Sequence, residues 1–408
     1  MKEKLITRDD LYLHSGRTWV EIDVEQLIKN YRTIKTSLKD ETQIIVVLKA
    51  NGYGHGSVEI AKTLSELDDA PSGFAVASLD EGLQLRENGI NKDILLFSFN
   101  ELERSAEAIN ADLTLTVASE NFGAKVNQTA SDLGKTAKVH LKLDTGMSRL
   151  GFNAFDDSAV DRMLELSKLE NLDITGMYTH FATADGEDYS TGRDVHKLAD
   201  EYFEMQLDKY LEVVGKLEDR GLHIGLKHTA NSGTIIAHKE AQMDAVRVGI
   251  LVYGAYPSDN GYMAEIKPIM SWKTRVMQVK EIKAGTSVSY NRQYVAAKDM
   301  TIAVLPVGYA DGYNRQMSGH AYVNYKGKNC PVIGMVNMDI IMIDCSEVDS
   351  AAEGDEVYLM LDHEGTDVNV YHHSKWQGTI PYEIYTSIAQ RVPRIYKKGE
   401  EIYKAVWL

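Results

Sequence analysis

Short apolar runs alternate with longer amphipathic segments over the first two thirds of the chain. Eight such runs are rich in aliphatic and β-branched residues, and segments with helical spacing separate them. The predicted strands cover residues 43–48, 74–77, 94–97, 113–117, 138–143, 174–179, 226–229 and 245–251. Eightfold alternation of strand and helix indicates an α/β fold and favours a (β/α)8 TIM barrel, with a doubly wound parallel sheet as the alternative.

Apolar residues at helical spacing predict the connecting helices. The clearest segments cover residues 25–38, 58–67, 79–88 and 195–219. Before the first of these, Asp23 and Gln26 have the spacing of a capping pair. We therefore expect a helix directly ahead of the first predicted barrel strand.

The pattern changes near residue 265. Short strand-like segments follow, broken by Gly, Asn and Lys-Gly turns, and no long helical period returns before residues 382–388. We expect a barrel domain over residues 12–264 and a mostly β domain over residues 265–408, with residues 1–11 as an N-terminal extension.

Composition and charge exclude several classes of protein. The 408 residues are 44% hydrophobic and 25% charged, which is typical of a soluble globular protein of two or three domains. A net charge of −16 and no basic run argue against nucleic-acid or membrane partners. The two cysteines, Cys330 and Cys345, provide neither a zinc motif nor a disulfide framework. With no signal-peptide pattern and no apolar span, we expect a cytoplasmic protein without a bound metal.

Chemistry-bearing residues follow the ends of the predicted strands. Because barrel active sites form at the carboxyl ends of the strands, these side chains should meet at one mouth. The residues concerned are Lys49, Lys142, Asp144, His180, Asn231, Ser232 and Arg247.

Lys49 is the sharpest of these candidates. A desolvated lysine has a lowered pKa and can form a Schiff base, with a lysine that snorkels to solvent or forms a salt bridge as the alternative. Glycines in residues 52–56 permit positive φ angles and close approach to a ligand. Residues 230–233 and 248–250 offer backbone N–H groups to an anion, with a simple turn as the alternative for Gly249.

Nine ordered motifs between Trp19 and Tyr396 carry a family resemblance. The chain resembles bacterial alanine racemases, which are fold-type III enzymes that use pyridoxal 5'-phosphate (PLP). The motifs are VVLKANGYGHG, KLDTGMSRLGF, YTHFATAD, HTANSG, RVGILVYG, VSYNRQYVA, LPVGYADGY, GMVNMD and RVPRIY.

The resemblance implies a two-base racemisation. Lys49 matches the lysine that forms a Schiff base with PLP and acts on the D face of the substrate. Tyr290 matches the base on the L face, which the partner subunit of a homodimer supplies. His180 matches a histidine that hydrogen-bonds this tyrosine, and Arg247 an arginine at the pyridine nitrogen. Because a guanidinium keeps its proton, the cofactor would be a restrained electron sink.

The resemblance also implies how cofactor and substrate bind. Arg149 and the backbone N–H of Met338 match the ligands of the substrate carboxylate, and Tyr309 matches a gate tyrosine. Lys142 matches a lysine that is carbamylated in many members. The phosphate would contact Tyr53, Ser232, Gly249, Ile250 and Tyr382, with Asn231 beside them.

Two departures from the family bear on the substrate. Asn291 and Asn337 stand where many members carry glycine and cysteine. We expect alanine as the substrate and D-alanine for peptidoglycan as the product. A serine or broader racemase, a PLP-binding regulator without turnover and a related decarboxylase are the alternatives.

Overall fold

The computed structural model describes residues 16–98, 101–184, 196–257, 263, 265–361 and 366–406. Contacts divide the chain into two compact units. The barrel unit contains residues 31–252 and 256–266, and the β-rich unit contains the chain up to residue 30, residues 253–255 and the chain from residue 267. Among the described residues, no helix is both long and apolar enough to cross a membrane.

All eight predicted parallel strands are present, which confirms the barrel and excludes the doubly wound sheet. Their order is β10-β2-β3-β4-β5-β6-β8-β9, and the short β7 (Phe152–Asn153) pairs with β6. The ring closes through hydrogen bonds from Asp244 N to Lys227 O (3.0 Å) and from Arg247 N to Ala230 O (2.9 Å). The strands are β2 (Gln43–Val47), β3 (Gly73–Val76), β4 (Asp93–Leu96), β5 (Thr114–Val117), β6 (Ala137–Asp144), β8 (Leu172–Tyr178), β9 (Leu226–His228) and β10 (Ala245–Val248).

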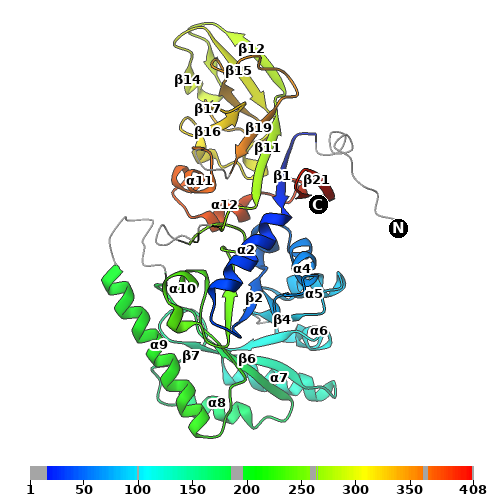
Figure 1. Ribbon diagram of the computed structural model, residues 1–408, viewed down its shortest axis with the longest axis vertical. Helices are drawn as coiled ribbons and strands as arrows, with labels where there is room; N and C mark the ends of the chain where they lie inside the picture. Colours follow the sequence, from blue (N-terminus) through cyan, green and yellow to red (C-terminus); the bar gives the residue numbers. More distant parts are fainter. Residues whose placement is uncertain are drawn as a thin grey trace. The chain divides into compact units, whose positions relative to one another are not determined.

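Helices cover the outside of these strands, as Figure 1 shows for α5 to α8. β3 and β5 are buried at every position, as expected for parallel strands with helices on one side and a filled interior on the other. Ser78 and Ser119 cap α5 and α7. The helices are α4 (Ser57–Ser65), α5 (Leu79–Glu87), α6 (Ser105–Asn110), α7 (Glu120–Asp132), α8 (Ala159–Ser167), α9 (His196–Asp219) and α10 (Ser232–Ala237), with 3-10 turns η1 (Leu102–Arg104) and η2 (Lys239–Ala241).

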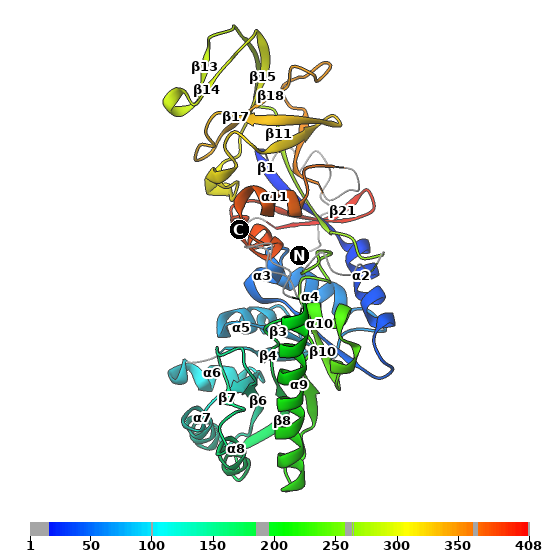
Figure 2. The same ribbon diagram turned by 90° about the vertical axis from the view of Figure 1, so that its left-hand side faces the viewer.

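The β-rich unit is built on one sheet with the order β12-β15-β18-β17-β16-β19-β11-β1-β20-β21. Figure 2 shows that the hairpin of β13 and β14 projects from its other strands. The strands are β1 (Thr18–Asp23), β11 (Met270–Arg275), β12 (Gln278–Ile282), β13 (Ser287–Val288), β14 (Tyr294–Val295), β15 (Met300–Leu305), β16 (Tyr322–Tyr325), β17 (Lys328–Ile333), β18 (Ile341–Asp344), β19 (Glu356–Met360), β20 (Arg394–Lys398) and β21 (Glu401–Val406). Three 3-10 turns lie between them: η3 (Tyr290–Arg292), η4 (Tyr309–Asp311) and η5 (Arg315–Met317).

Strand β1 differs from the sequence prediction, which placed this segment in the barrel domain that begins at residue 12. β1 pairs antiparallel with β11 and parallel with β20, so residues 18–30 belong to the β-rich unit. Both partners lie far along the chain, and no local pattern identifies them. The helix that follows, α2 (Val24–Ser37), is capped as predicted, because the Asp23 carboxylate accepts a hydrogen bond from Gln26 N (2.9 Å).

Two helices lie late in the β-rich unit, where the sequence predicted one. α12 (Pro381–Ser387) matches the predicted segment, but α11 (Val370–Gln377) was missed. Its residues, VYHHSKWQ, form no clear apolar stripe. The Asn369 side chain starts α11 by accepting hydrogen bonds from the first turn, and Gly378 ends it in the left-handed conformation.

Candidate active site

Five basic side chains gather at the carboxyl ends of the barrel strands. Each lowers the pKa of His180 or is His180 itself, so all five interact electrostatically. We call them the strand-end cluster: Lys49 after β2, Lys142 in β6, Arg149 in the loop after β6, His180 after β8 and Arg247 in β10. The predicted mouth is therefore present within the barrel unit.

Arg247 is the most firmly held member of the cluster. Its side chain is 3% exposed and donates to the carbonyl oxygens of His228 (2.6 Å), Thr179 (2.8 Å) and Thr229 (3.0 Å). Within the described part of the chain its hydrogen-bond partners are carbonyl oxygens and imidazole nitrogens, and none is a carboxylate. Burial lowers the pKa of Arg247 to about 10, so the guanidinium keeps its charge at neutral pH. A fixed cation without an acidic partner suits an anion or a ring-nitrogen acceptor.

His180 takes its protonation state from Arg247. Burial, followed by the nearby Arg247 charge, lowers the pKa of His180 well below its usual range, so the ring is neutral. The Arg247 Nη2 group lies 3.4 Å from His180 Nδ1. Since a guanidinium only donates, Nδ1 is the acceptor and this network assigns the ring proton to Nε2. His180 is thereby a directed hydrogen-bond donor.

The two lysines of the cluster have lowered pKa values. Burial is the main cause at Lys142, which is 5% exposed, and with the Arg247 charge it lowers the pKa to about 7. Lys49 is exposed as a residue, yet desolvation by the protein atoms around its amine, together with Arg149, lowers its pKa. A substantial neutral fraction at physiological pH makes the Lys142 amine nucleophilic, and Lys49 is shifted in the same direction.

The segment after Lys49 forms a left-handed turn, labelled α3 (Lys49–Tyr53) in Figure 2. The φ angles are 53° at Ala50, 55° at Asn51, 60° at Gly52 and 52° at Tyr53. Left-handed backbone costs roughly 1–2 kcal/mol at each non-glycine residue, so other contacts must hold the turn. The glycine pattern predicted positive φ angles here but did not reveal that three residues with side chains share them.

Glu81 stabilises this turn and was not among the predicted site residues. One of its carboxylate oxygens accepts from Ala50 N (2.6 Å), and the other accepts from Ala77 N (2.8 Å) and Ser78 N (3.1 Å). Glu81 therefore caps α5 and ties that helix to the turn behind Lys49. The sequence signal was the Ser78–Glu81 capping-box spacing, which indicates a helix start and not a site.

Tyr53, Ser232 and Gly249 form a cradle of hydroxyl and amide groups. The Gly249 N–H donates to Ser232 Oγ (3.1 Å), and a Cβ atom at Gly249 would lie 2.5 Å from Tyr53 Oη. Gly249 is thus required because the Tyr53 hydroxyl packs closely against its backbone, and not because the chain turns there. Asn231 lies behind this cradle and caps α10, accepting from Thr234 N at 3.0 Å. Ile250, another predicted phosphate contact, follows Gly249 and is buried.

Three of the four predicted site residues of the β-rich unit have the opposite environment, since they are exposed. Tyr290 is 69% exposed, Met338 54% and Tyr309 42%. Asn337 brings their segments together, because its side-chain oxygen accepts from Ser289 Oγ (3.2 Å) and its carbonyl accepts from Tyr309 N (3.0 Å). We call Tyr290, Tyr309 and Met338 the tyrosine face.

The two departures from the family lie in this face. Asn291 has a φ angle of 59°, a left-handed conformation that glycine adopts freely and that asparagine tolerates better than most residues. The Asn337 side-chain oxygen is engaged by Ser289. That contact occupies the Asn337 oxygen and leaves it less available to the hydroxyl group of a substrate such as serine.

A buried carboxylate supports the tyrosine face. Asp311 accepts hydrogen bonds from Arg17, from Gly308 N (2.9 Å) and from Arg391 Nε (2.8 Å), while Arg391 also donates to Asp339 (2.6 Å). This network fixes the backbone on either side of Tyr309 and Met338. No local sequence pattern indicates this network, because Arg17 and Arg391 come from opposite ends of the chain.

Tyr382, predicted for the phosphate, lies half-buried in α12 of the β-rich unit. The other phosphate candidates lie in the barrel unit, so the joint role of Tyr382 with them stays a prediction.

Comparison with known proteins identifies both parts of the chain. Residues 22–257 match the family model "Alanine racemase, N-terminal domain", and residues 269–396 match "Alanine racemase, C-terminal domain". The chain is 38% identical to alanine racemase 2 of Caldanaerobacter subterraneus subsp. tengcongensis, over 95% of this chain and 96% of that protein.

Solved structures agree with these matches. An alanine racemase of Clostridium difficile has a TM-score of 0.89 and 36% identity, over 96% of this chain and 98% of that one. An alanine racemase from Bartonella henselae with covalently bound pyridoxal phosphate has a TM-score of 0.79 and 27% identity, over 93% of this chain and 99% of that one.

Proposed function

The chain belongs to the alanine racemase family, and we propose that it interconverts L-alanine and D-alanine with PLP as its cofactor. We further propose a cytoplasmic homodimer with shared active sites that supplies D-alanine for peptidoglycan. The observation that carries the proposal is the strand-end cluster, in which Lys49 lies among fixed cations beside the cradle of Tyr53, Ser232 and Gly249.

The residues present fit PLP. Its phosphate needs hydrogen-bond donors and a close backbone approach, which the Tyr53 and Ser232 hydroxyls and the glycine at position 249 offer. Its dianionic charge is complemented by a cluster whose most buried cation, Arg247, has no carboxylate partner among the described residues. When bound, PLP supplies an electron-accepting ring that stabilises negative charge at the substrate α-carbon. Ile250 and Tyr382 complete the proposed phosphate contacts.

Arg247 would face the pyridine nitrogen of the cofactor. Carbonyl oxygens accept its hydrogens from one side, which fixes the plane of the guanidinium. A guanidinium does not release its proton at neutral pH, so Arg247 would donate a hydrogen bond to the nitrogen and would not protonate it. We infer that this restrains electron withdrawal and disfavours reactions other than proton exchange.

Two residues would move the α-proton. Lys49 Nζ, with its lowered pKa, takes or returns the proton on one face of the substrate. Tyr290 of the partner subunit does so with its phenol oxygen on the other face. The high exposure of Tyr290 within its own chain supports this role, because an exposed base is available to a second subunit. His180, with its proton on Nε2, would hydrogen-bond the phenol oxygen and assist its ionisation.

Arg149 and the backbone N–H of Met338 would bind the substrate carboxylate, with Tyr309 narrowing the approach. Lys142 would orient Arg149 after carbamylation. Its pKa of about 7 supports this modification, because only a neutral amine reacts with carbon dioxide. Within the folded chain Lys142 Nζ donates to Leu143 O (2.8 Å), which holds the amine near the mouth.

The decisive experiment combines product analysis with labelling. Purified protein with PLP should convert L-alanine to D-alanine, and borohydride reduction followed by peptide mapping should find the cofactor on Lys49. Serine, tested in parallel, should give a lower kcat/KM, because Ser289 already engages the Asn337 oxygen. Absence of interconversion, or an adduct on another lysine, would overturn the proposal, and a serine preference would support the broader racemase.

A further inference from the structure

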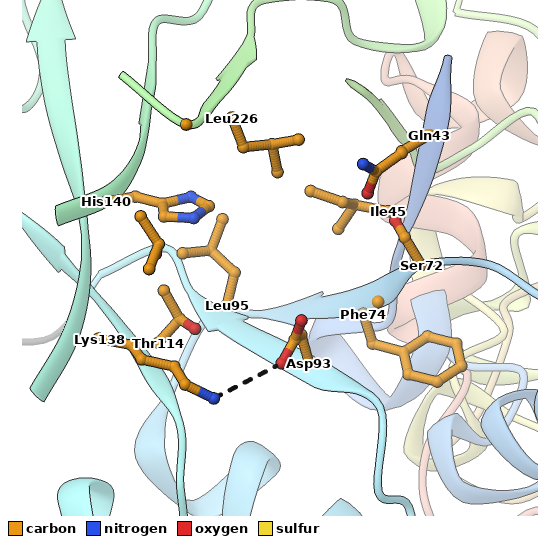
Figure 3. Close-up of a pocket in the computed structure, with 13 residues that line it drawn as sticks. Gln43, Ile45, Ser72, Phe74, Asp93, Leu95, Thr114, Lys138, His140 and Leu226 are labelled. Atoms are coloured by element: carbon orange, nitrogen blue, oxygen red, sulfur yellow. Dashed lines mark ion pairs between the residues drawn. The ribbon is translucent and has the colours of Figure 1, made fainter. Parts of the chain in front are cut away.

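A second cavity lies at the opposite end of the barrel from the strand-end cluster. It has a volume of about 380 Å³ and is lined at the amino-terminal ends of the strands (Figure 3). No residue of the proposed active site lines it. We call it the barrel-base cavity. Its lining combines the apolar Ile45, Phe74, Leu95 and Leu226 with the polar Gln43, Ser72, Asp93, Thr114, Lys138, His140 and Thr175.

His140 is the polar group that enters this cavity from the barrel interior. It lies in the middle of β6, is 6% exposed and points into the cavity in Figure 3. Gly176, its partner on β8, makes room for the ring, because a Cβ atom there would lie 2.8 Å from His140 Nε2. A bulkier residue at position 176 would displace the imidazole.

A chain of hydrogen bonds connects His140 to the strand-end cluster. Arg247 Nη1 lies 3.0 Å from His228 Nδ1, and His228 Nε2 lies 2.9 Å from His140 Nδ1. Because Arg247 only donates, His228 Nδ1 accepts and its proton lies on Nε2. His228 therefore donates to His140 Nδ1, which places the remaining proton of His140 on Nε2, next to Gly176 and close to its strand partner Leu226 in the cavity lining.

Both rings of this chain are neutral. Burial lowers the pKa of His140 to about 4, with the Arg247 charge adding to the effect. Burial, followed by the His140 and Arg247 charges, lowers the pKa of His228 well below its usual range. Arg247 thus orients an N–H donor at the barrel base without placing a second charge there.

We propose that the barrel-base cavity binds a small uncharged molecule with an apolar body and a carbonyl oxygen that accepts the Nε2–H of His140. The carbonyl draws this proton, which strengthens the two hydrogen bonds behind it and increases the electron density that His228 offers to Arg247. The lining favours an uncharged ligand, because its walls are largely apolar, the His140 ring is neutral, and the Lys138 ammonium is already paired with Asp93 and Asp112. The proposal that a molecule binds here depends on these contacts alone. Any effect of binding on catalysis would act through Arg247 and therefore rests on the proposed function.

Histidine-labelled ¹⁵N NMR of the full-length protein purified with PLP tests the proposal, with benzamide as the probe. We expect a saturable shift of the His140 Nε2–H signal and a smaller shift at His228. Gln43→Trp should block the exposed mouth and remove both shifts, whereas the matched Gln43→Ala should retain them. Ser72→Trp provides a second blocking variant if the first does not fold.

A His140→Phe variant should bind benzamide about tenfold more weakly, since it loses one buried hydrogen bond. His140→Gln, which restores an N–H donor, should recover part of this loss. Absence of a shift up to the solubility limit, or a shift that persists in both blocking variants, would overturn the binding site. A shift confined to His140 would overturn the coupling to Arg247. Neither readout depends on racemase activity, so failure here is distinct from failure of the proposed function.

Discussion

The two groups of proposed site residues differ in how the chain holds them. In the barrel unit, Lys142 and Arg247 are buried and find their partners within the same unit. In the β-rich unit, Tyr290, Tyr309 and Met338 are exposed, and backbone and neighbouring side chains hold them in place. Folding of one chain therefore orders the strand-end cluster, whereas the tyrosine face stays exposed, as we expect of groups proposed to act on a second subunit.

Charge reinforces this contrast. The chain as a whole is strongly acidic, yet the strand-end cluster concentrates cations on one barrel mouth. In the tyrosine face the arginines behind Tyr309 are paired, since Arg17 and Arg391 both bind Asp311. The barrel half is thus prepared for an anion, and the face is prepared to place a phenol and a backbone N–H at fixed positions.

Loss of Lys49 should have the largest effect, because the residue is proposed both to hold the cofactor and to move a proton. Lys49→Ala should lower kcat/KM for alanine by on the order of 10⁴-fold or more. Formation of D-alanine from L-alanine measures the loss. Lys168→Ala removes an exposed lysine remote from the site and should keep full activity. Comparable activity of Lys49→Ala and Lys168→Ala would show that Lys49, and with it the proposed barrel half of the site, takes no part in the mechanism.

Loss of the Tyr290 hydroxyl should have the next largest effect. Tyr290→Phe should lower racemisation by about 10² to 10⁴-fold, the usual contribution of one general base. In deuterated water, however, D-alanine should still exchange its α-proton through Lys49, while exchange of L-alanine should fall with racemisation. Mass spectrometry of the two enantiomers measures both rates. Equal loss of the two exchange reactions would contradict a two-base division between the halves.

Mixed dimers test whether Lys49 and Tyr290 of one site come from two different chains. A dimer of one Lys49→Ala chain and one Tyr290→Phe chain holds one intact site if the tyrosine comes from the partner subunit. Mixing the two inactive variants should then restore up to half of the activity per mixed dimer. No recovery would indicate that Tyr290 serves the barrel of its own chain.

The barrel half was also the more predictable half. Eight parallel strands place their carboxyl ends at one mouth. Once the barrel was inferred, the polar residues that follow the strands, such as Lys49 and His180, were therefore expected to lie close together. The hydrogen-bond partners of these side chains were harder to predict from the sequence. That Arg247 donates to carbonyl oxygens beyond the ends of β8 and β9 depends on strand register, which the apolar pattern does not specify.

The parts that sequence reasoning missed depend on contacts between distant segments. From the sequence, Glu81 is an ordinary helix-capping residue. Only the folded structure shows that its second carboxylate oxygen accepts a hydrogen bond from Ala50 N. Strand β1 and the Asp311 network need partners from the far end of the chain. His140 reads as one more residue of a buried strand, because nothing local shows that Gly176 opens space for its ring. Patterns of spacing identify elements, whereas such contacts are properties of the closed fold.

The smallest predicted effect concerns the cradle. It tests whether the cradle is preformed in the folded barrel unit, as its burial indicates. Gly249→Ala places a Cβ atom 2.5 Å from Tyr53 Oη, so the tyrosine must move. We expect PLP to bind roughly tenfold more weakly, the consequence of one displaced hydrogen bond, with a smaller change in kcat at saturating cofactor.

Gly215→Ala is the matched control, because a Cβ atom at this position of α9 meets no atom within 4 Å. The control should bind PLP normally and gain about 0.5 to 1 kcal/mol in the free energy of unfolding, since alanine favours helix over glycine. Fluorescence titration of the two variants with PLP compares them directly. Equal affinities would mean that Tyr53 moves without cost, and the cradle would then be adaptable and not preformed.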